Sequence, residues 1–250
     1  MSLDLHTLPV ERPADLYTAD DLSESGRRPV AEAQVQTLQK LAALEALRWH
    51  FRDDPQMYVM ANMFVYFWNK HGVLAKQAPD IFAAHGVSKE RRRVYYVEQE
   101  GKAPDLIIEF VSRKTRIFDL IYKPEVYAWL GVSEYFVFAP LGAYRKPRLT
   151  GFALAGKEYV PMDTAPSRLR SNVLGLDLAV EDGNLRFYDP RTDEKLLTYE
   201  EAQAARQLAE AQAQGETAAR HAAEAENARL RDELARMQKK MSKQLTPKPS

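Results

Sequence analysis

The stretch PDLIIEFVSRKTRIFDLIYKPEVYAWLGVSEYFVFAP, residues 104–140, decides the fold. It begins with an apolar run at 106–111 that is typical of a strand buried in a sheet. A segment with helical character follows at 119–131 and ends at a glycine, which often closes a helix. A second apolar strand is predicted at 134–140. Strand, helix and strand in this order form a βαβ unit, so we expect neighbouring parallel strands and an α/β fold.

One residue in the first of these strands breaks the apolar pattern. Glu109 lies in the middle of the run, and a buried carboxylate is costly unless a partner compensates its charge. A structural ion pair is the plain explanation. The alternative is a functional site, in which the partner of Glu109 takes part in binding or catalysis.

The composition is that of an ordinary globular protein. Of the 250 residues, 45% are hydrophobic and 28% are charged, and the formal net charge is zero. Nucleic acid would therefore have to bind a local basic patch. The absence of cysteine excludes disulfides, thiol nucleophiles and cysteine-ligated zinc. No signal peptide or membrane-spanning stretch is recognisable, so we expect a cytoplasmic protein with no membrane partner.

The chain divides into three parts by composition. Residues 1–29 carry several prolines and predict a flexible N-terminal arm. Residues 30–198 carry the strand patterns and an amphipathic helix at 31–51. Residues 199–245 are rich in Ala, Glu, Gln and Arg and predict a long helix outside the core. Further strands are predicted at 57–68 (two short strands or one bent strand), 78–87, 148–154, 157–162 and, as a hairpin around Asp182-Gly183, at 176–189.

The motifs of a phosphate-binding loop and of a nucleophilic serine are missing, which leaves carboxylates as the route to chemistry. Asp105 lies on the same strand as Glu109, but at ~3.3 Å per residue the two backbones are ~13 Å apart. One ion cannot bridge that distance, so Asp105 is expected to be structural. Asp80 lies on the preceding strand and could face Glu109. The two carboxylates would repel each other unless a hard divalent cation, Mg²⁺ or Mn²⁺, lay between them.

A lysine completes the candidate set. Lys123 follows the Glu109 strand, and its ammonium group could hold a water molecule for attack and stabilise charge on a phosphate. Pro124 comes directly after it. Proline is unfavourable inside a helix but welcome in the first turn, so we expect the helix to begin near Pro124 with Lys123 at its edge.

These residues resemble those of a known family. The order Pro-Asp, Glu-x-x-Ser, Asp-x-x-x-Lys-x-x-x-Tyr and Gly-Val-x-Glu-Tyr is similar to that of the Uma-two group of bacterial restriction endonucleases, in the PD-(D/E)xK nuclease superfamily. The resemblance extends from Val30 to Ala202. It implies a restriction-endonuclease-like mixed sheet flanked by helices, to which this chain adds a long C-terminal helix or coiled coil.

The resemblance also implies roles for individual residues. It gives Asp80 and Glu109 as metal ligands and Lys123 as the catalytic lysine, whereas the position two residues after Glu109 holds a valine. Three further residues are implied as additional metal ligands or as supports of the site: Glu32, Ser112 and Tyr127. Glu32 has a plain alternative, since an acidic residue in a first helical turn suits the helix dipole. The chain also has Gln36 at a position where the family pattern favours histidine or another polar residue.

Two basic clusters could hold a DNA backbone. One is the run Arg91, Arg92 and Arg93, and the other comprises Arg113, Lys114 and Arg116 beside the Glu109 strand. A solvated loop is the plain alternative for both. The leading function is therefore a Mg²⁺-dependent endodeoxyribonuclease. The alternative is a nuclease-fold binding or assembly module with weak or no catalysis, which acts through its C-terminal helix.

The tail has its own pattern. Apolar side chains and one asparagine recur at alternating steps of four and three at Ala223, Asn227, Leu230, Leu234, Met237 and Met241. This spacing is typical of a coiled-coil seam, and one asparagine at an a position favours a parallel dimer. The sequence therefore suggests a homodimer through residues 223–241. The alternative is a solvated, alanine-rich helix.

Overall fold

The computed structural model describes residues 28–111, 118–140, 148–163 and 167–244. Most of the predicted N-terminal arm thus lies outside the described residues. The chain forms two compact units, Met1–Thr198 and Tyr199–Ser250, which we describe separately.

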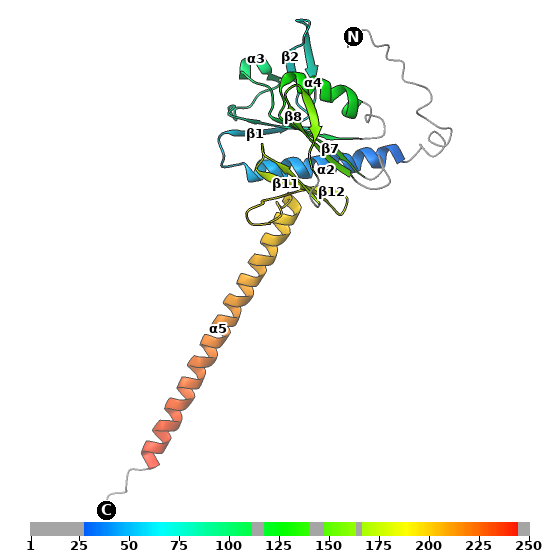
Figure 1. The fold of residues 1–250 in the computed structure, drawn as a ribbon. Helices are drawn as coiled ribbons and strands as arrows, with labels where there is room; N and C mark the ends of the chain where they lie inside the picture. The colour runs from blue at the N-terminus through cyan, green and yellow to red at the C-terminus, as the bar shows by residue number, and fades with distance from the viewer. Residues whose placement is uncertain (1–27, 112–117, 141–147, 164–166, 245–250) are drawn as a thin grey trace, which may run out of the picture. The chain divides into compact units, whose positions relative to one another are not determined.

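A six-stranded mixed sheet is the centre of the first unit (Figure 1). Strands β6 (Leu106–Phe110) and β7 (Glu134–Ala139) are parallel and their neighbours pair antiparallel, so the predicted βαβ unit and mixed sheet are confirmed. Across the sheet the strands are β1 (Met57–Ala61), β4 (Ile81–His85), β6 (Leu106–Phe110), β7 (Glu134–Ala139), β8 (Arg148–Ala155) and β9 (Glu158–Pro161).

The connection from β6 to β7 differs from the single helix expected at 119–131. In its described part, the connection is a π-helical turn, η2 (Phe118–Tyr122), followed directly by α4 (Lys123–Leu130). The change has a local cause, because Pro124 has no N–H to donate to a carbonyl one turn earlier. Gly131 ends α4 in the left-handed conformation, with φ 80°.

Both faces of the central sheet are covered, as expected for an α/β fold. One face packs against α2 (Arg28–His50) and a three-stranded sheet, through a core that includes Leu47, Ile108 and Phe136. The strands of that sheet are β10 (Arg168–Ser171), β11 (Leu176–Glu181) and β12 (Asn184–Tyr188). The β11–β12 hairpin turns at Asp182 and Gly183, whose φ angles of 50° and 79° suit the predicted turn.

The other face packs against α4 through a second core, which includes Phe82, Ile107 and Tyr127. A second three-stranded sheet belongs to this side. It comprises β3 (Leu74–Gln77), β2 (Val65–Trp68) and β5 (Tyr95–Tyr96), followed by the short helix α3 (Val97–Glu100). The predicted stretch 57–68 is thus two strands, β1 and β2, that join different sheets.

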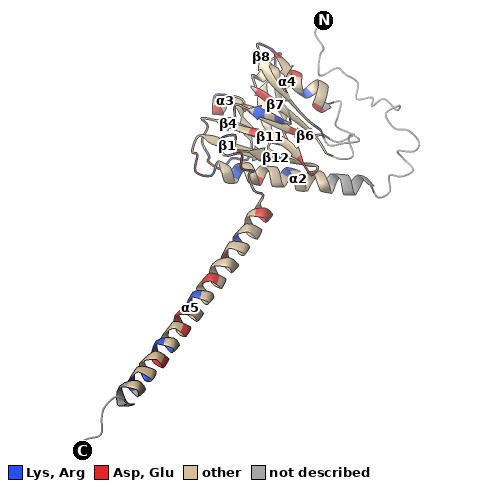
Figure 2. Cartoon of the chain, turned by 60° about the horizontal axis from the view of Figure 1, so that its bottom comes forward, with Lys and Arg blue, Asp and Glu red and all other residues tan. Residues whose placement is uncertain are grey.

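The second unit is one helix, α5 (Tyr199–Gln244), as the sequence predicted. Both acidic and basic residues are distributed along it (Figure 2), and pairs such as Arg206–Glu210 and Arg220–Glu224 lie one turn apart at 2.8 and 2.9 Å. The seam residues Leu230, Leu234, Met237 and Met241 are exposed. Of the helices in the described residues, α2 to α5, none has the length and apolarity needed to cross a membrane.

Candidate active site

Two carboxylates meet where β4 begins and β6 ends. In the antiparallel register Phe82 pairs with Ile107 and Ile81 with Ile108, so one further step places Asp80 opposite Glu109 on the same face. The backbone N–H of Asp80 lies 3.4 Å from Glu109 Oε2, and the N–H of Phe110 donates to Asp80 Oδ2 at 2.7 Å. The two predicted metal ligands are therefore side by side.

Glu109 is only 1% exposed, and its carboxylate contacts other polar side chains. Lys123 Nζ lies 2.9 Å from Oε2, and the Tyr127 hydroxyl donates to Oε1 at 2.8 Å. Burial raises the pKa of Glu109 to about 8; the Lys123 ammonium opposes the rise, and the Asp80 and Asp119 carboxylates add to it. The Glu109 carboxylate is thus harder to ionise than an exposed one.

Lys123 points into the site in spite of Pro124. It begins α4, and its ammonium group pairs with Asp119 at 2.7 Å as well as with Glu109. Burial acts to lower the pKa of Lys123, but the Glu109 and Asp119 carboxylates outweigh it and raise that pKa above its usual range. Lys123 is therefore an ammonium group held between two buried carboxylates.

Asp119 is a site residue to which sequence reasoning gave no role. It is 2% exposed and lies one turn before Lys123, across the π-helical turn. The signal was present, because the Asp-x-x-x-Lys spacing was part of the recognised pattern. Asp119 contacts the lysine rather than the two facing carboxylates, so it positions Lys123.

Helix α2 contributes from the other side of the sheet. Gln36 Nε2 donates to the Val111 carbonyl at 3.2 Å, and Lys40, one turn further, donates to Asp80 Oδ1. Lys40 was missed; its signal was its place as the one lysine in the predicted helix 31–51. Glu32 lies one turn before Gln36 in α2, but its side chain is outside the described residues.

The other predicted residues fall into three groups. Tyr127 contacts Glu109 directly, as described above. Asp105 lies at the opposite end of β6, where it accepts from the His85 N–H and pairs with Lys102, both at 2.7 Å, so its structural role is confirmed. Ser112 and the second basic cluster, Arg113, Lys114 and Arg116, lie outside the described residues.

The first basic cluster is divided between surface and interior. Arg91 and Arg93 are exposed. Arg92 pairs with Glu100 at 2.5 Å and lies over the Tyr58 ring at 4.5 Å. Because its guanidinium group already makes these intramolecular contacts, we leave Arg92 out of the proposed nucleic-acid contacts.

The donor set fits a small hard cation. Asp80 and Glu109 supply carboxylate oxygens, and Mg²⁺ is commonly held by one or two carboxylates, with water and substrate phosphate completing its shell. Within the described ranges, no three or more His, Cys, Asp or Glu side chains are grouped so that they could hold a metal.

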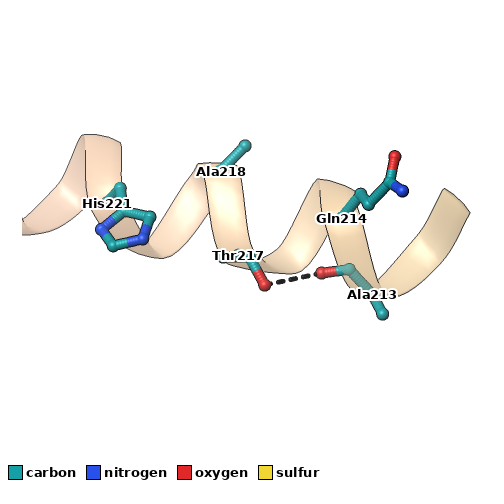
Figure 3. A pocket seen from close by; sticks show the side chains of 5 residues that line it. All are labelled: Ala213, Gln214, Thr217, Ala218 and His221. Carbon is teal, nitrogen blue, oxygen red and sulfur yellow. Dashed lines mark hydrogen bonds between the residues drawn. The ribbon is translucent and has the colours of Figure 1, made fainter. Parts of the chain in front are cut away.

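A hollow on α5 is unrelated to this chemistry. Figure 3 shows that its lining, Ala213, Gln214, Thr217, Ala218 and His221, comes from this one helix. Thr217 donates to the Ala213 carbonyl at 2.8 Å. The hollow brings no acid and base together, so it is helix surface rather than an active site.

Comparison with known proteins agrees with the pattern of the site. The family Uma2, described as "Putative restriction endonuclease", matches residues 28–181. The chain belongs to this family. The matched range includes Asp80, Glu109, Asp119, Lys123 and Tyr127, so family membership supports a nuclease.

The solved structures that match this chain include one of a bacterial protein. It is described as "a putative nuclease belonging to DUF820 from Anabaena variabilis", with 12% sequence identity and a TM-score of 0.43. The match covers 58% of this chain and 76% of the other. No match was found among the curated proteins.

Proposed function

We propose that the protein is a metal-dependent endonuclease that hydrolyses phosphodiester bonds in DNA. One observation carries the proposal: the Asp80 and Glu109 carboxylates face each other on adjacent strands, and the Lys123 ammonium lies 2.9 Å from Glu109. Two acids and a lysine in this arrangement can hold a cation and leave a charged donor beside it. In this proposal Asp80 and Glu109 bind Mg²⁺ or Mn²⁺.

Each side chain has a part in the proposed reaction. The bound cation would polarise the phosphate and lower the pKa of a water molecule. Lys123 donates hydrogen bonds to the attacking water or to a phosphate oxygen, where negative charge develops. Asp119 keeps the Lys123 side chain directed at this point, and Tyr127 fixes one oxygen of Glu109.

The DNA strand would be held by basic side chains of the two clusters. Arg91 and Arg93 are exposed, and we assign phosphate contacts to them and to Arg113, Lys114 and Arg116. Because the net charge is zero, such contacts depend on local clusters, and binding should weaken as salt rises. A DNA substrate is also consistent with the cytoplasmic location expected from the sequence.

The helix α5 is assigned to assembly. We propose that residues 223–241 pair two chains as a parallel coiled coil, which would give one complex two nuclease sites. The exposed leucines and methionines of the seam support this assignment. The same feature favours a second candidate function, a nuclease-fold assembly module with little catalysis, and a cleavage measurement separates the two.

The test is cleavage of supercoiled plasmid DNA, and of RNA in parallel, with Mg²⁺ or Mn²⁺. Glu109→Ala and Asp80→Asn should each lose at least about a hundredfold in rate, because each removes charge that holds the cation. Asp105→Asn is the matched control: it alters the other Pro-Asp pair, at the far end of β6, and should retain the wild-type rate.

The outcomes separate the possibilities. Cleavage that survives in Glu109→Ala would contradict the proposed site. Wild-type protein that binds the cation but cuts neither DNA nor RNA would favour the assembly module. RNA cleavage without DNA cleavage would retain the site and correct the substrate.

A further inference from the structure

A second lysine contacts one of the two proposed metal ligands. The Lys40 ammonium donates to Asp80 Oδ1 and lies 3.4 Å from Asn62 Oδ1. Lys40 and Asp80 are about equally shielded, with side chains 20% and 19% exposed. Each proposed metal ligand therefore has its own lysine: Lys123 for Glu109 and Lys40 for Asp80.

Asn62 extends the row of polar residues by one strand. In the β1–β4 register Ala61 pairs with Ile81, so the next step places Asn62 beside Asp80. The Asn62 N–H lies 3.2 and 3.3 Å from the Pro79 and Asp80 carbonyls, which fixes this residue next to the proposed ligand. The Lys40 ammonium thus lies between two oxygens of adjacent strands, in an environment that also suits a metal cation.

The position of Lys40 affects the net charge of the site. With Asp80, Glu109 and Asp119 ionised, three carboxylates face two ammonium groups, which leaves one negative charge. A divalent cation changes this balance to one positive charge. A substrate phosphodiester carries one negative charge and would bring the net charge of the site to zero. In a partly buried site such charge differences are worth far more than in water.

We propose that Lys40 is an internal counter-ion that competes with the divalent cation for Asp80 until a substrate phosphate arrives, and so couples metal binding to nucleic-acid binding. This inference rests on the proposed function, because it takes Asp80 and Glu109 as the metal ligands. Lys40 is a positioning residue here. Its effect is exerted through Asp80, and it involves no covalent step.

The test is calorimetry with Mn²⁺ as the probe, on the full chain without nucleic acid. Lys40→Met and Lys40→Gln should bind Mn²⁺ at least about tenfold more tightly than the wild type, because both remove the competing charge. Lys40→Arg keeps the charge and should resemble the wild type. Lys102→Met is the matched control, since it breaks the ion pair between Lys102 and Asp105 at the other end of β6. Thermal unfolding of each variant establishes that it is folded.

A second measurement tests the coupling. A phosphorothioate DNA duplex, which resists hydrolysis, should raise the Mn²⁺ affinity of the wild type at least about tenfold and that of Lys40→Met by less. A purely structural role for Lys40 predicts the opposite sign in the first experiment: its removal would disorder Asp80 and weaken Mn²⁺ binding.

The outcomes are distinguishable from those of the proposed function. Mn²⁺ binding that is unchanged or weaker in both neutral variants, while Glu109→Ala abolishes it, overturns the inference about Lys40 and leaves the metal site intact. Binding that persists in Glu109→Ala overturns the metal site and the inference together. Tighter binding in Lys40→Met and Lys40→Gln, with Lys102→Met unchanged, supports the inference.

Discussion

At the residue scale, one ammonium group compensates two buried carboxylates. Lys123 lies 2.9 Å from Glu109 and 2.7 Å from Asp119, which are 1% and 2% exposed. Neither acid can be ionised cheaply without this partner, because both are removed from water. The residue proposed to act on the substrate therefore also stabilises the site in the absence of metal.

Replacing Lys123 should consequently have two effects. Lys123→Met should abolish cleavage. Above about pH 8, where Glu109 is ionised in the metal-free protein, it should also lower the free energy of unfolding in EDTA by about 3 kcal/mol, the cost of breaking a buried ion pair. Saturating Mn²⁺ should recover part of this loss, since the cation offsets the same carboxylates. Lys102→Met, which breaks the more exposed pair with Asp105, should cost less than about 1 kcal/mol. Wild-type stability of Lys123→Met in EDTA would show that the ion pair contributes nothing.

The pKa of Glu109 leads to a pH-dependent stability of the metal-free protein. Burial raises this pKa to about 8 in the folded state, from 4.5 for an exposed group. The folded chain then binds more protons than the unfolded chain between these values, so its stability falls as pH rises through this window. In Glu109→Gln the contribution is removed.

Urea unfolding in EDTA at several pH values measures the effect. Relative to the wild type, Glu109→Gln should gain stability as pH increases from about 5 to about 8. The comparison with the wild type cancels titrations elsewhere in the chain. A difference between the two proteins that stays constant across this range would contradict the raised pKa.

At the scale of the elements, close packing between the sheets limits what the strands can carry. Gly151 on β8 faces the three-stranded sheet of β10, β11 and β12. A Cβ atom built on Gly151 would lie 2.9 Å from Phe136 Cε1 and from Met162 Sδ, and 3.1 Å from Leu169 Cδ1 on β10. These distances are shorter than van der Waals contact, so the Phe136, Met162 and Leu169 side chains can occupy this space only because residue 151 has no side chain of its own.

Gly151→Ala should therefore destabilise the first unit by about 1–3 kcal/mol through overpacking. Chemical denaturation followed by tryptophan fluorescence measures this change. Gly215→Ala is the matched control, because the same added methyl meets nothing within 4 Å on α5. It should leave the unfolding of the first unit unchanged and slightly raise the helix content. A stability of Gly151→Ala equal to that of the wild type would show that the neighbouring side chains can move aside.

The elements also show why some of the site was predictable from sequence. The buried strands around Glu109 and the hairpin at Asp182-Gly183 follow from local patterns, namely continuous apolar runs and a turn dipeptide. The convergence of Asp80 with Glu109 required only that two consecutive strong strands be neighbours. Lys123 was found because it follows the Glu109 strand, and Tyr127 because the family resemblance implies it four residues further on.

Lys40 and Asn62 could not be found in this way. Lys40 reaches Asp80 from a helix that covers the opposite face of the sheet, and Asn62 lies beside Asp80 only because β1 pairs with β4. These contacts depend on long-range packing, which no local pattern reports. The start of a helix near Pro124 was predicted correctly, since α4 begins at Lys123 with Pro124 in its first turn, but the π-helical turn before it was not predicted.

At the scale of the whole molecule, α5 is the feature that a single chain does not explain. A helix of 46 residues exposes Leu230, Leu234, Met237 and Met241 at 48–61% of their surface. Helices in proteins owe most of their stability to packing of an apolar face. A second copy of the chain would cover this seam, and charge favours a parallel arrangement: Glu226 at a g position would meet Arg231 at the following e position of the partner chain.

The last prediction is therefore that the full chain is a dimer and that a chain ending at Thr198 is a monomer, as measured by analytical ultracentrifugation. Leu234→Glu should dissociate the dimer, because it places a charge in the seam, whereas Ala235→Glu adds the same charge one residue outside it and should not. Glu226→Arg should weaken the dimer, and Glu226→Arg combined with Arg231→Glu should restore it, since only a parallel, in-register pair brings these positions together. An antiparallel pair would not show this rescue, and equal mass for the full and shortened chains would exclude α5 as the dimer contact.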